Sequence, residues 1–299
     1  MLHIDLFGPT IVTQGGKRVT CQAVGGAKPW QLLEILAVSG DTPVSKDLLA
    51  ELLWEGRPPR SYLGTLESYV CVLRKSLGLG RGRVSALRTV TRGYVLDPDA
   101  VTVDVGEFRR LVRSSATAGR GTTLETLERA LSLVRGELLA GEAYATWAIR
   151  EREAFRAELV AATSLGAQLA LAQDEPDRAV RLARTAVLGD GLAEESARLL
   201  MCALHRCGRQ GEALRAYADL RARLSDELGA EPSLASRQLY LEILRGDGTS
   251  CSERGLDSRE EVLVLVRLLQ QVLPSAAGAL GGVDDRTLAR AVRDLAAAV

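Results

Sequence analysis

The stretch RSYLGTLESYVCVLRKSLG, residues 60–78, has the periodicity of a helix with two unlike faces. On one face apolar residues recur at intervals of three and four, which predicts a helix that packs on a core. These residues are Leu63, Leu66, Val70, Leu73 and Leu77. The opposite face carries small side chains framed by basic ones, whereas a face that meets only solvent is usually rich in Glu and Lys. Small side chains permit close approach, so this second face is a candidate binding surface.

Two more helices are predicted upstream of this one. The stretch KPWQLLEILAVSG, residues 28–40, predicts a helix with Pro29 in its first turn and Gly40 just past its end. Residues 46–54 form the next helix, with Ser45 as its N-cap. The two-faced helix is therefore the third of a compact tri-helical unit, which is the place of a recognition helix that enters the major groove of DNA.

Short strands are predicted on both sides of the three helices. Alternating apolar residues within 2–6, followed by a Gly-Gly turn at 15–16, predict a small antiparallel sheet. Residues 87–91 and 94–96 predict a hairpin with a tight turn at Arg92-Gly93. A basic hairpin directly after a recognition helix is a wing, and we expect it to contact the DNA backbone or an adjacent minor groove.

Positive charge is unevenly distributed along the chain. The sequence has 38 Lys and Arg residues and 38 Asp and Glu residues, so its formal net charge is zero. Residues 1–96 contain twelve basic and seven acidic residues, and within 57–92 eight basic residues stand against one acidic residue, Glu67. Because Lys and Arg neutralise phosphates and release counterions, this asymmetry favours a nucleic-acid partner for the N-terminal part.

We predict that DNA is contacted by the second face of the third helix and by the wing. Thr65 and Ser68 are expected to hydrogen-bond base edges, while flanking Arg and Lys residues hold phosphates. The predicted DNA-binding residues are Arg60, Ser61, Gly64, Thr65, Ser68, Cys71, Val72, Arg74, Lys75, Arg88, Thr91 and Arg92.

The order of sheet, three helices and wing over residues 2–96, with LESYVCVLRKSLG followed by RTVTRGYVL, resembles the winged-helix DNA-binding domain of the OmpR type. More narrowly, the whole layout resembles the Streptomyces antibiotic regulatory protein (SARP) family of actinobacterial activators. In that family the recognition segment usually reads T-Y-V-S-R-L-R-R, where this chain has SYVCVLRK at 68–75. Cys71 and Val72 thus replace a usual Ser and Arg, and Val72 could touch a thymine methyl group.

The second half of the chain contains a repeat. Residues 165–187 superpose on residues 199–221 with an offset of 34, which is the period of the tetratricopeptide helix pair. Each pair leaves an apolar face that a neighbouring pair covers, and the stack usually offers a concave protein-binding surface. The run ALHRCGRQGEALRAYADLRARLSDELGAEPS, residues 203–233, also resembles the bacterial transcriptional activation domain that follows the winged helix in SARP proteins.

The predicted fold is mainly α, with three parts. Residues 1–98 form an OmpR-type winged helix, a small α+β domain, and residues 99–246 form an all-α, tetratricopeptide-like activation domain. Residues 247–299 form a linker and a C-terminal helical extension for packing or dimerisation. The resemblance implies a sequence-specific DNA-binding activator of secondary-metabolite (antibiotic) biosynthesis genes. It further implies binding to direct repeats of double-stranded DNA near promoters, as a homodimer or tandem protomers, and recruitment of RNA polymerase holoenzyme.

The sequence does not point to an enzyme. It has no nucleotide fingerprint and no nucleophile elbow, and the Gly-Gly-Lys at 15–17 lacks the spacing of a phosphate-binding loop. With His3 and His205 as its only histidines, a zinc site is short of ligands, and the five cysteines are interpreted as reduced, buried thiols. No cofactor and no metal are therefore predicted.

We expect a cytoplasmic, nucleoid-associated protein without a membrane partner. No apolar run approaches the ~18 residues of a transmembrane helix, and MLHIDLFG does not open like a signal peptide.

Two other interpretations of the N-terminal unit stay open. In one, the chain is a tetratricopeptide-type interaction or sensor protein whose winged helix contacts protein. In the other, the unit is a small α+β domain that binds nothing, with Cys71 and Val72 buried against the second domain. Salt dependence separates a DNA-binding protein from an interaction protein, because only phosphate binding weakens steeply as salt rises.

Overall fold

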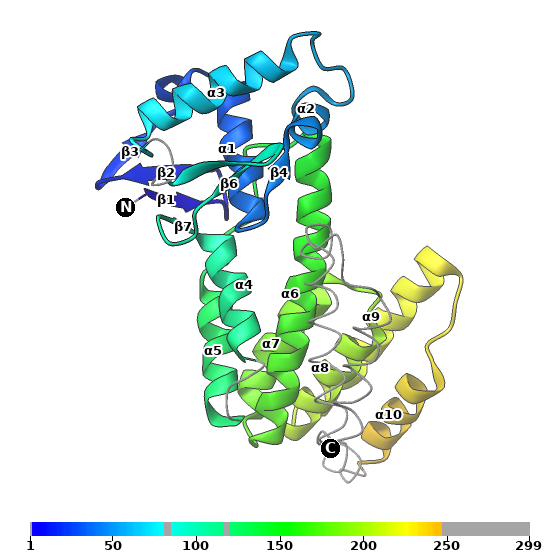
Figure 1. The fold of residues 1–299 in the computed structure, drawn as a ribbon. Helices are drawn as coiled ribbons and strands as arrows, with labels where there is room; N and C mark the ends of the chain where they lie inside the picture. Colours follow the sequence, from blue (N-terminus) through cyan, green and yellow to red (C-terminus); the bar gives the residue numbers. More distant parts are fainter. Residues whose placement is uncertain (1, 81–84, 116–119, 247–299) are drawn as a thin grey trace, which may run out of the picture. The chain divides into compact units, whose positions relative to one another are not determined.

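The computed structural model describes residues 2–80, 85–115 and 120–246. The fold has the predicted class, with small sheets near the N-terminus and helices through the rest of this part of the chain (Figure 1). It divides into two compact units, one of residues 2–111 and 132–154 and one of residues 112–131 and 155–246. The predicted boundaries at 98 and 246 stay predictions, and the proposed C-terminal extension lies outside the described residues.

The first unit contains a four-stranded sheet in the order β3-β2-β1-β7. Strands β1 (Leu2–Asp5), β2 (Ile11–Gln14) and β3 (Lys17–Val19) are antiparallel neighbours. The glycines at 15 and 16 form the turn between β2 and β3, with φ of 54° and 78° in the left-handed region that glycine tolerates. The fourth strand, β7 (Val101–Val103), was not among the predicted strands and pairs in parallel with β1.

A buried carboxylate follows β7. Asp104 is the first residue of α4 (Asp104–Ser115), and its oxygens accept hydrogen bonds from the backbone N–H groups of Leu6 at 2.9 and 2.8 Å and of Phe7 at 2.9 Å. Burial raises the pKa of Asp104, while the N–H groups of Phe7, Leu6 and Val105 act in the opposite direction. The carboxylate ties the chain after the winged helix to the end of the first strand.

The three predicted helices are present. Helix α1 spans Ala27–Ser39 and is followed by Gly40, and α2 spans Lys46–Trp54. The hydroxyl of Ser45 accepts a hydrogen bond from the N–H of Leu48 at 3.1 Å, which confirms the predicted N-cap of α2. A short 3-10 helix, η1 (Cys21–Val24), precedes α1, and α3 spans Tyr62–Ser76.

The wing is a three-stranded sheet in the order β4-β6-β5, formed by β4 (Val44–Ser45), β5 (Leu87–Val90) and β6 (Gly93–Leu96). The predicted turn at Arg92-Gly93 is wrong by one residue. Gly93 already pairs with Val90 and with Ser45, so the turn consists of Thr91 and Arg92. Arg92 has φ of 66°, a conformation that sequence reasoning assigns more readily to glycine.

Residues 137–152 complete the first unit. Phe7 and Leu138 form an antiparallel bridge, and the N–H of Leu139 donates to the carbonyl of Leu6 at 2.8 Å. The Arg152 guanidinium donates to the carbonyls of Leu139 at 3.0 Å and Glu142 at 3.3 Å, which holds the intervening loop in place.

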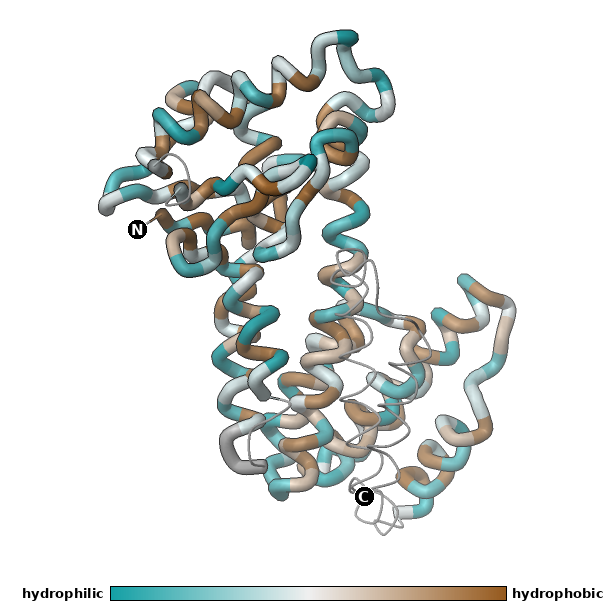
Figure 2. The backbone as a smooth tube through the Cα atoms, viewed as in Figure 1, coloured by the Kyte–Doolittle hydropathy of each residue, from teal (hydrophilic) through white to brown (hydrophobic). Residues whose placement is uncertain are grey.

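The second unit is helical. Its elements include α5 (Arg120–Ser132), α6 (Thr146–Ala172), α7 (Pro176–Gly189), α8 (Glu194–Arg206), α9 (Gln210–Leu228) and α10 (Leu234–Arg245), of which α5 and α6 also extend into the first unit. Figure 2 shows apolar residues recurring along these helices. Ala179 of α7 and Ala213 of α9, which are 34 residues apart, are both fully buried, in agreement with the repeat. No helix in the described ranges has the length and apolar character needed to cross a membrane.

Candidate nucleic-acid interface

Helix α3 packs on its unit through the predicted apolar stripe. Leu66, Val70, Leu73 and Leu77 are buried. Leu63 is 46% exposed, so the prediction is wrong for this residue. Its neighbours Ser61 and Gly64 are exposed as well, which indicates that the first turn of α3 extends past the core.

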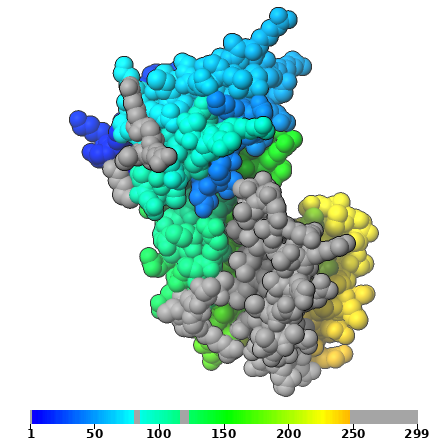
Figure 3. Space-filling view, in the orientation of Figure 1, coloured from blue at the N-terminus to red at the C-terminus, as the bar shows by residue number. Residues whose placement is uncertain are grey.

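Helix α3 lies at the surface of the first unit (Figure 3), and the residues opposite its apolar stripe are exposed. Ser61, Gly64, Ser68, Cys71 and Lys75 are all exposed, and their spacing of three and four residues places them on one side of the helix. We call these five residues the α3 face. Lys75 is the one charged residue among the five, and the other four have small side chains or none.

Two further predicted residues border the α3 face. Arg60 is exposed just before the helix. Thr65 is partly exposed, and its hydroxyl donates to the carbonyl of Ser61 at 3.1 Å. Because its proton is used within the helix, the Thr65 hydroxyl is left to accept a hydrogen bond from a partner.

Gly64 has no internal packing role. A methyl group added at this position would meet nothing within 4 Å. A glycine inside a helix costs about 1 kcal/mol relative to alanine, and neither a turn nor a tight internal contact accounts for it here. Close approach by an external molecule would account for it.

Two predicted site residues point toward their own unit instead. A methyl group at Gly25 would lie 3.3 Å from Cγ1 of Val72, so Val72 is half-buried beside the connection between η1 and α1. The Arg74 guanidinium donates to the carbonyl of Leu87 from Nε at 3.0 Å and Nη2 at 2.7 Å, and to Oγ1 of Thr89 at 2.8 Å. Arg74 therefore fixes α3 to strand β5 of the wing.

The wing residues fall into two groups. Thr91 and Arg92 are exposed at the tip of the hairpin. Nε of Arg88 lies 3.8 Å from Oδ2 of Asp97. Because side chains alternate along a strand, Arg88 points away from the side of β5 on which Thr89 meets Arg74. The α3 face therefore lies on one side of a single helix, with Arg60 directly before that helix. Arg88 lies on the side of β5 that faces away from α3.

Lys46, at the start of α2, connects α2 to α3 and to the wing, and it was not among the predicted site residues. The ammonium group of Lys46 lies 2.7 Å from Oε1 of Glu67 on α3 and 5.7 Å from the ring centre of Tyr94. The backbone N–H of Lys46 donates to the carbonyl of Arg92 at 2.9 Å. The hydrogen bond to Glu67 raises the pKa of Lys46, so Lys46 stays charged. These contacts join the wing to two helices, and the sequence carries no periodic signal for a pair 21 residues apart.

The cysteines differ from their interpretation as buried thiols. Cys71 is exposed, and Cys21, Cys202 and Cys207 are partly exposed, while Cys251 lies outside the described residues. Their exposure follows from their positions at helix ends and outer helix faces. In the part of the chain that the structure describes, no group of three or more His, Cys, Asp or Glu side chains is placed to hold a metal ion.

The chain is similar to several known regulatory proteins. The family model described as bacterial transcriptional activator domain matches residues 103–244. The regulatory protein DnrI of Streptomyces peucetius is 31% identical over 82% of this chain and 93% of its own length. The transcriptional regulator RedD of Streptomyces coelicolor is 33% identical over 82% of this chain and 71% of its own length.

A solved structure is also similar. It is Mycobacterium tuberculosis EmbR in complex with a low affinity phosphopeptide, which superposes with a TM-score of 0.71 at 27% identity. The match covers 91% of this chain and 70% of that one. The similarity thus extends over nearly the whole chain, from the small sheets to the helices.

Proposed function

The chain belongs to the Streptomyces antibiotic regulatory protein family of transcriptional regulators, and from this premise we propose that the α3 face reads DNA in the major groove. The protein is a regulator and not an enzyme. Its proposed role is sequence-specific activation of secondary-metabolite biosynthesis genes, carried out in the cytoplasm on nucleoid DNA.

The observation that carries this proposal is the exposed α3 face with its glycine. A recognition helix presents side chains that can hydrogen-bond base edges, and neighbouring groups bind phosphates and fix its orientation on the duplex. Ser61 and Ser68 can hydrogen-bond base edges, and the space above Gly64 admits the groove floor. Arg60 and Lys75, near the two ends of α3, are placed to bind phosphates on either side.

The wing adds a second contact in this proposal. Thr91 and Arg92 at its tip reach the backbone or an adjacent minor groove. Arg74, Lys46 and Glu67 act by positioning, since their contacts hold the wing, α2 and α3 together. The two parts of the interface then meet DNA as one rigid body, without an entropic cost for ordering them.

Activation requires a second set of contacts. We assign them to the tetratricopeptide-like helices of the second unit, which would contact RNA polymerase holoenzyme and a neighbouring protomer on direct repeats about one helical turn apart. A contribution of about 1.4 kcal/mol to polymerase binding already raises promoter occupancy tenfold. Modest contacts therefore suffice for activation at a weak promoter.

The experiment that tests the function is a gel-shift titration of the whole chain. Promoter fragments from its own gene neighbourhood are compared with unrelated DNA at 50 and 200 mM salt. With Arg60, Lys75 and Arg92 on phosphates, we expect one fragment to bind saturably and its affinity to fall about 40-fold over this salt range. Absence of binding to every fragment, or binding insensitive to salt, would favour an interaction protein instead.

Two substitutions on the α3 face test its orientation. Lys75→Ala should weaken binding to cognate and unrelated DNA alike, by about tenfold, because it removes a phosphate contact. Ser68→Ala should mainly lower the preference for cognate DNA, by about 1 kcal/mol, because it removes a base contact. Dissociation constants for both DNAs, measured by fluorescence anisotropy, check both expectations. If both variants bind cognate DNA like the wild type, another face of α3 meets the groove.

A further inference from the structure

The β2–β3 hairpin is fixed against the C-terminal end of α3. The side-chain amide of Gln14, the last residue of β2, donates to the carbonyl of Leu77 at 2.6 Å. A methyl group at Gly78 would lie 2.7 Å from that amide nitrogen, so the Gln14 side chain lies directly against Gly78. The hairpin tip therefore has a defined position beside the helix that carries the α3 face.

Strand register decides which side chain of this hairpin faces α3. Gln14 is directly opposite Lys17, and opposite residues of antiparallel strands have their side chains on the same face of the sheet. Gln14 is also opposite Leu2, which is buried. Lys17 thus extends from the same side of the sheet as Gln14 and Leu2, which is the side that meets α3. Lys17 itself is exposed, because β3 is the outermost strand.

The next residue, Arg18, extends from the other side. It is directly opposite Thr13, which in turn pairs with the exposed residue His3. Arg18 and Lys17 are both exposed and carry the same charge, one residue apart on the same strand. Lys17 and Arg18 are therefore two neighbouring cations on opposite sides of the sheet, and of these two Lys17 is on the side of α3.

Two elements contribute positive charge at this end of α3. The Gln14–Leu77 hydrogen bond and the pairing of Gln14 with Lys17 place the strand that carries Lys17 beside the end of the helix, whose last turn carries the exposed Lys75. Gly15 and Gly16 leave the hairpin tip without side chains. An ammonium group binds phosphate as a point charge, and a bare turn lets a bulky backbone come close. Duplex DNA seated on the α3 face presents a phosphate backbone on both sides of its groove.

We propose that Lys17 binds a phosphate of the DNA backbone beside the recognition helix, so that the N-terminal sheet is part of the DNA interface. This inference rests on the proposed function, since it needs DNA on the α3 face. It adds a third contact to the helix and the wing, from a part of the chain about 60 residues before Lys75. The contact carries no base preference, because a phosphate is the same at every step.

The test compares Lys17→Gln with Arg18→Gln in the whole chain, by fluorescence anisotropy with cognate and unrelated duplexes between 50 and 300 mM salt. For Lys17→Gln we expect affinity for both duplexes to fall about fivefold to tenfold at 100 mM salt. The slope of log affinity against log salt should become shallower by about 0.9. Arg18→Gln should match the wild type in both, and Lys17→Arg should restore most of the affinity.

Three outcomes overturn the inference. If Lys17→Gln keeps the wild-type slope, Lys17 touches no phosphate. If Arg18→Gln weakens binding equally, the effect is one of net charge and not of place. If wild-type protein binds neither duplex, the proposed function fails and this inference with it. Thermal unfolding of each variant separates a loss of binding from a loss of folding, because a lysine that only stabilises the end of α3 would change the melting temperature without changing the salt slope.

Discussion

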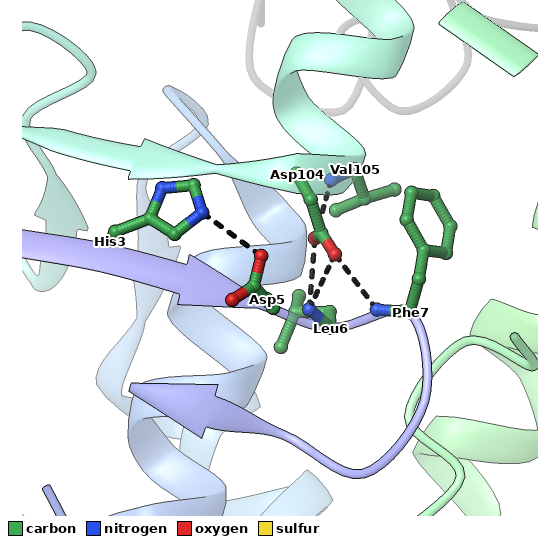
Figure 4. Close-up of polar contacts among 6 residues, drawn as sticks. All are labelled: His3, Asp5, Leu6, Phe7, Asp104 and Val105. Atoms are coloured by element: carbon green, nitrogen blue, oxygen red, sulfur yellow. Dashed lines mark hydrogen bonds and ion pairs between the residues drawn. The ribbon is translucent and has the colours of Figure 1, made fainter. Parts of the chain in front are cut away.

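Replacing Asp104 with alanine is expected to lower the free energy of unfolding of the first unit by roughly 3 to 5 kcal/mol. The carboxylate accepts hydrogen bonds from the N–H groups of Leu6, Phe7 and Val105 (Figure 4). Leu6 and Phe7 are themselves buried, so their N–H groups cannot turn to water when the carboxylate is removed. Each buried donor left without a partner costs about 1 to 3 kcal/mol, and the smaller side chain leaves a gap as well.

The measurement is urea unfolding followed by tryptophan fluorescence. Trp30, Trp54 and Trp147 all lie in the first unit, so their emission reports on that unit by itself. The control is Asp99→Ala, which removes the same charge from an exposed position in the same unit. We expect the control to stay within about 0.5 kcal/mol of the wild type. Equal unfolding midpoints for the two variants would show that the Asp104 contacts do not stabilise the unit.

Local patterns in the sequence were sufficient to predict the helices of the first unit. The N-cap at Ser45 and the glycine after α1 act within a few residues of the helix ends that they set, and the stripe of α3 depends on periodicity alone. The same periodicity places Ser68 and Lys75 opposite Leu66 and Leu73. The exposed part of the candidate site could therefore be read from one short stretch.

Contacts between residues far apart in the chain could not be predicted. Strand β7 pairs with residues of β1 that lie 99 positions earlier, and Leu6 lies 98 positions before Asp104. The periodicity of α3 predicts that Val72 and Arg74 are exposed. In the structure Val72 lies against Gly25, and Arg74 donates to the carbonyl of Leu87 in strand β5. Whether a residue of a helix can contact a partner depends on such neighbours, and the periodicity of the helix itself does not reveal them.

Gly93→Ala is expected to destabilise the first unit by about 3 kcal/mol, although it adds only one methyl group. That methyl would lie 2.3 Å from the carbonyl oxygen of Val44 and 3.1 Å from Cα of Ser45. Both are backbone atoms of β4, so no side-chain rotation relieves the clash, and the β4–β6 pairing must open. Because Ser45 caps α2 and the next residue, Lys46, bonds to Glu67, the disturbance reaches the recognition helix.

Gly64→Ala is the matched control for this substitution, since the same methyl group at that position meets nothing within 4 Å. There we expect the free energy of unfolding to rise by up to about 1 kcal/mol, because alanine favours a helix over glycine. DNA affinity should nevertheless fall, since the methyl occupies the space that the groove floor needs. Urea unfolding should therefore show a loss of stability for Gly93→Ala and a gain for Gly64→Ala. Fluorescence anisotropy measures the DNA affinity of both variants. If Gly93→Ala unfolds like the wild type, the close approach of β4 to Gly93 does not stabilise the first unit.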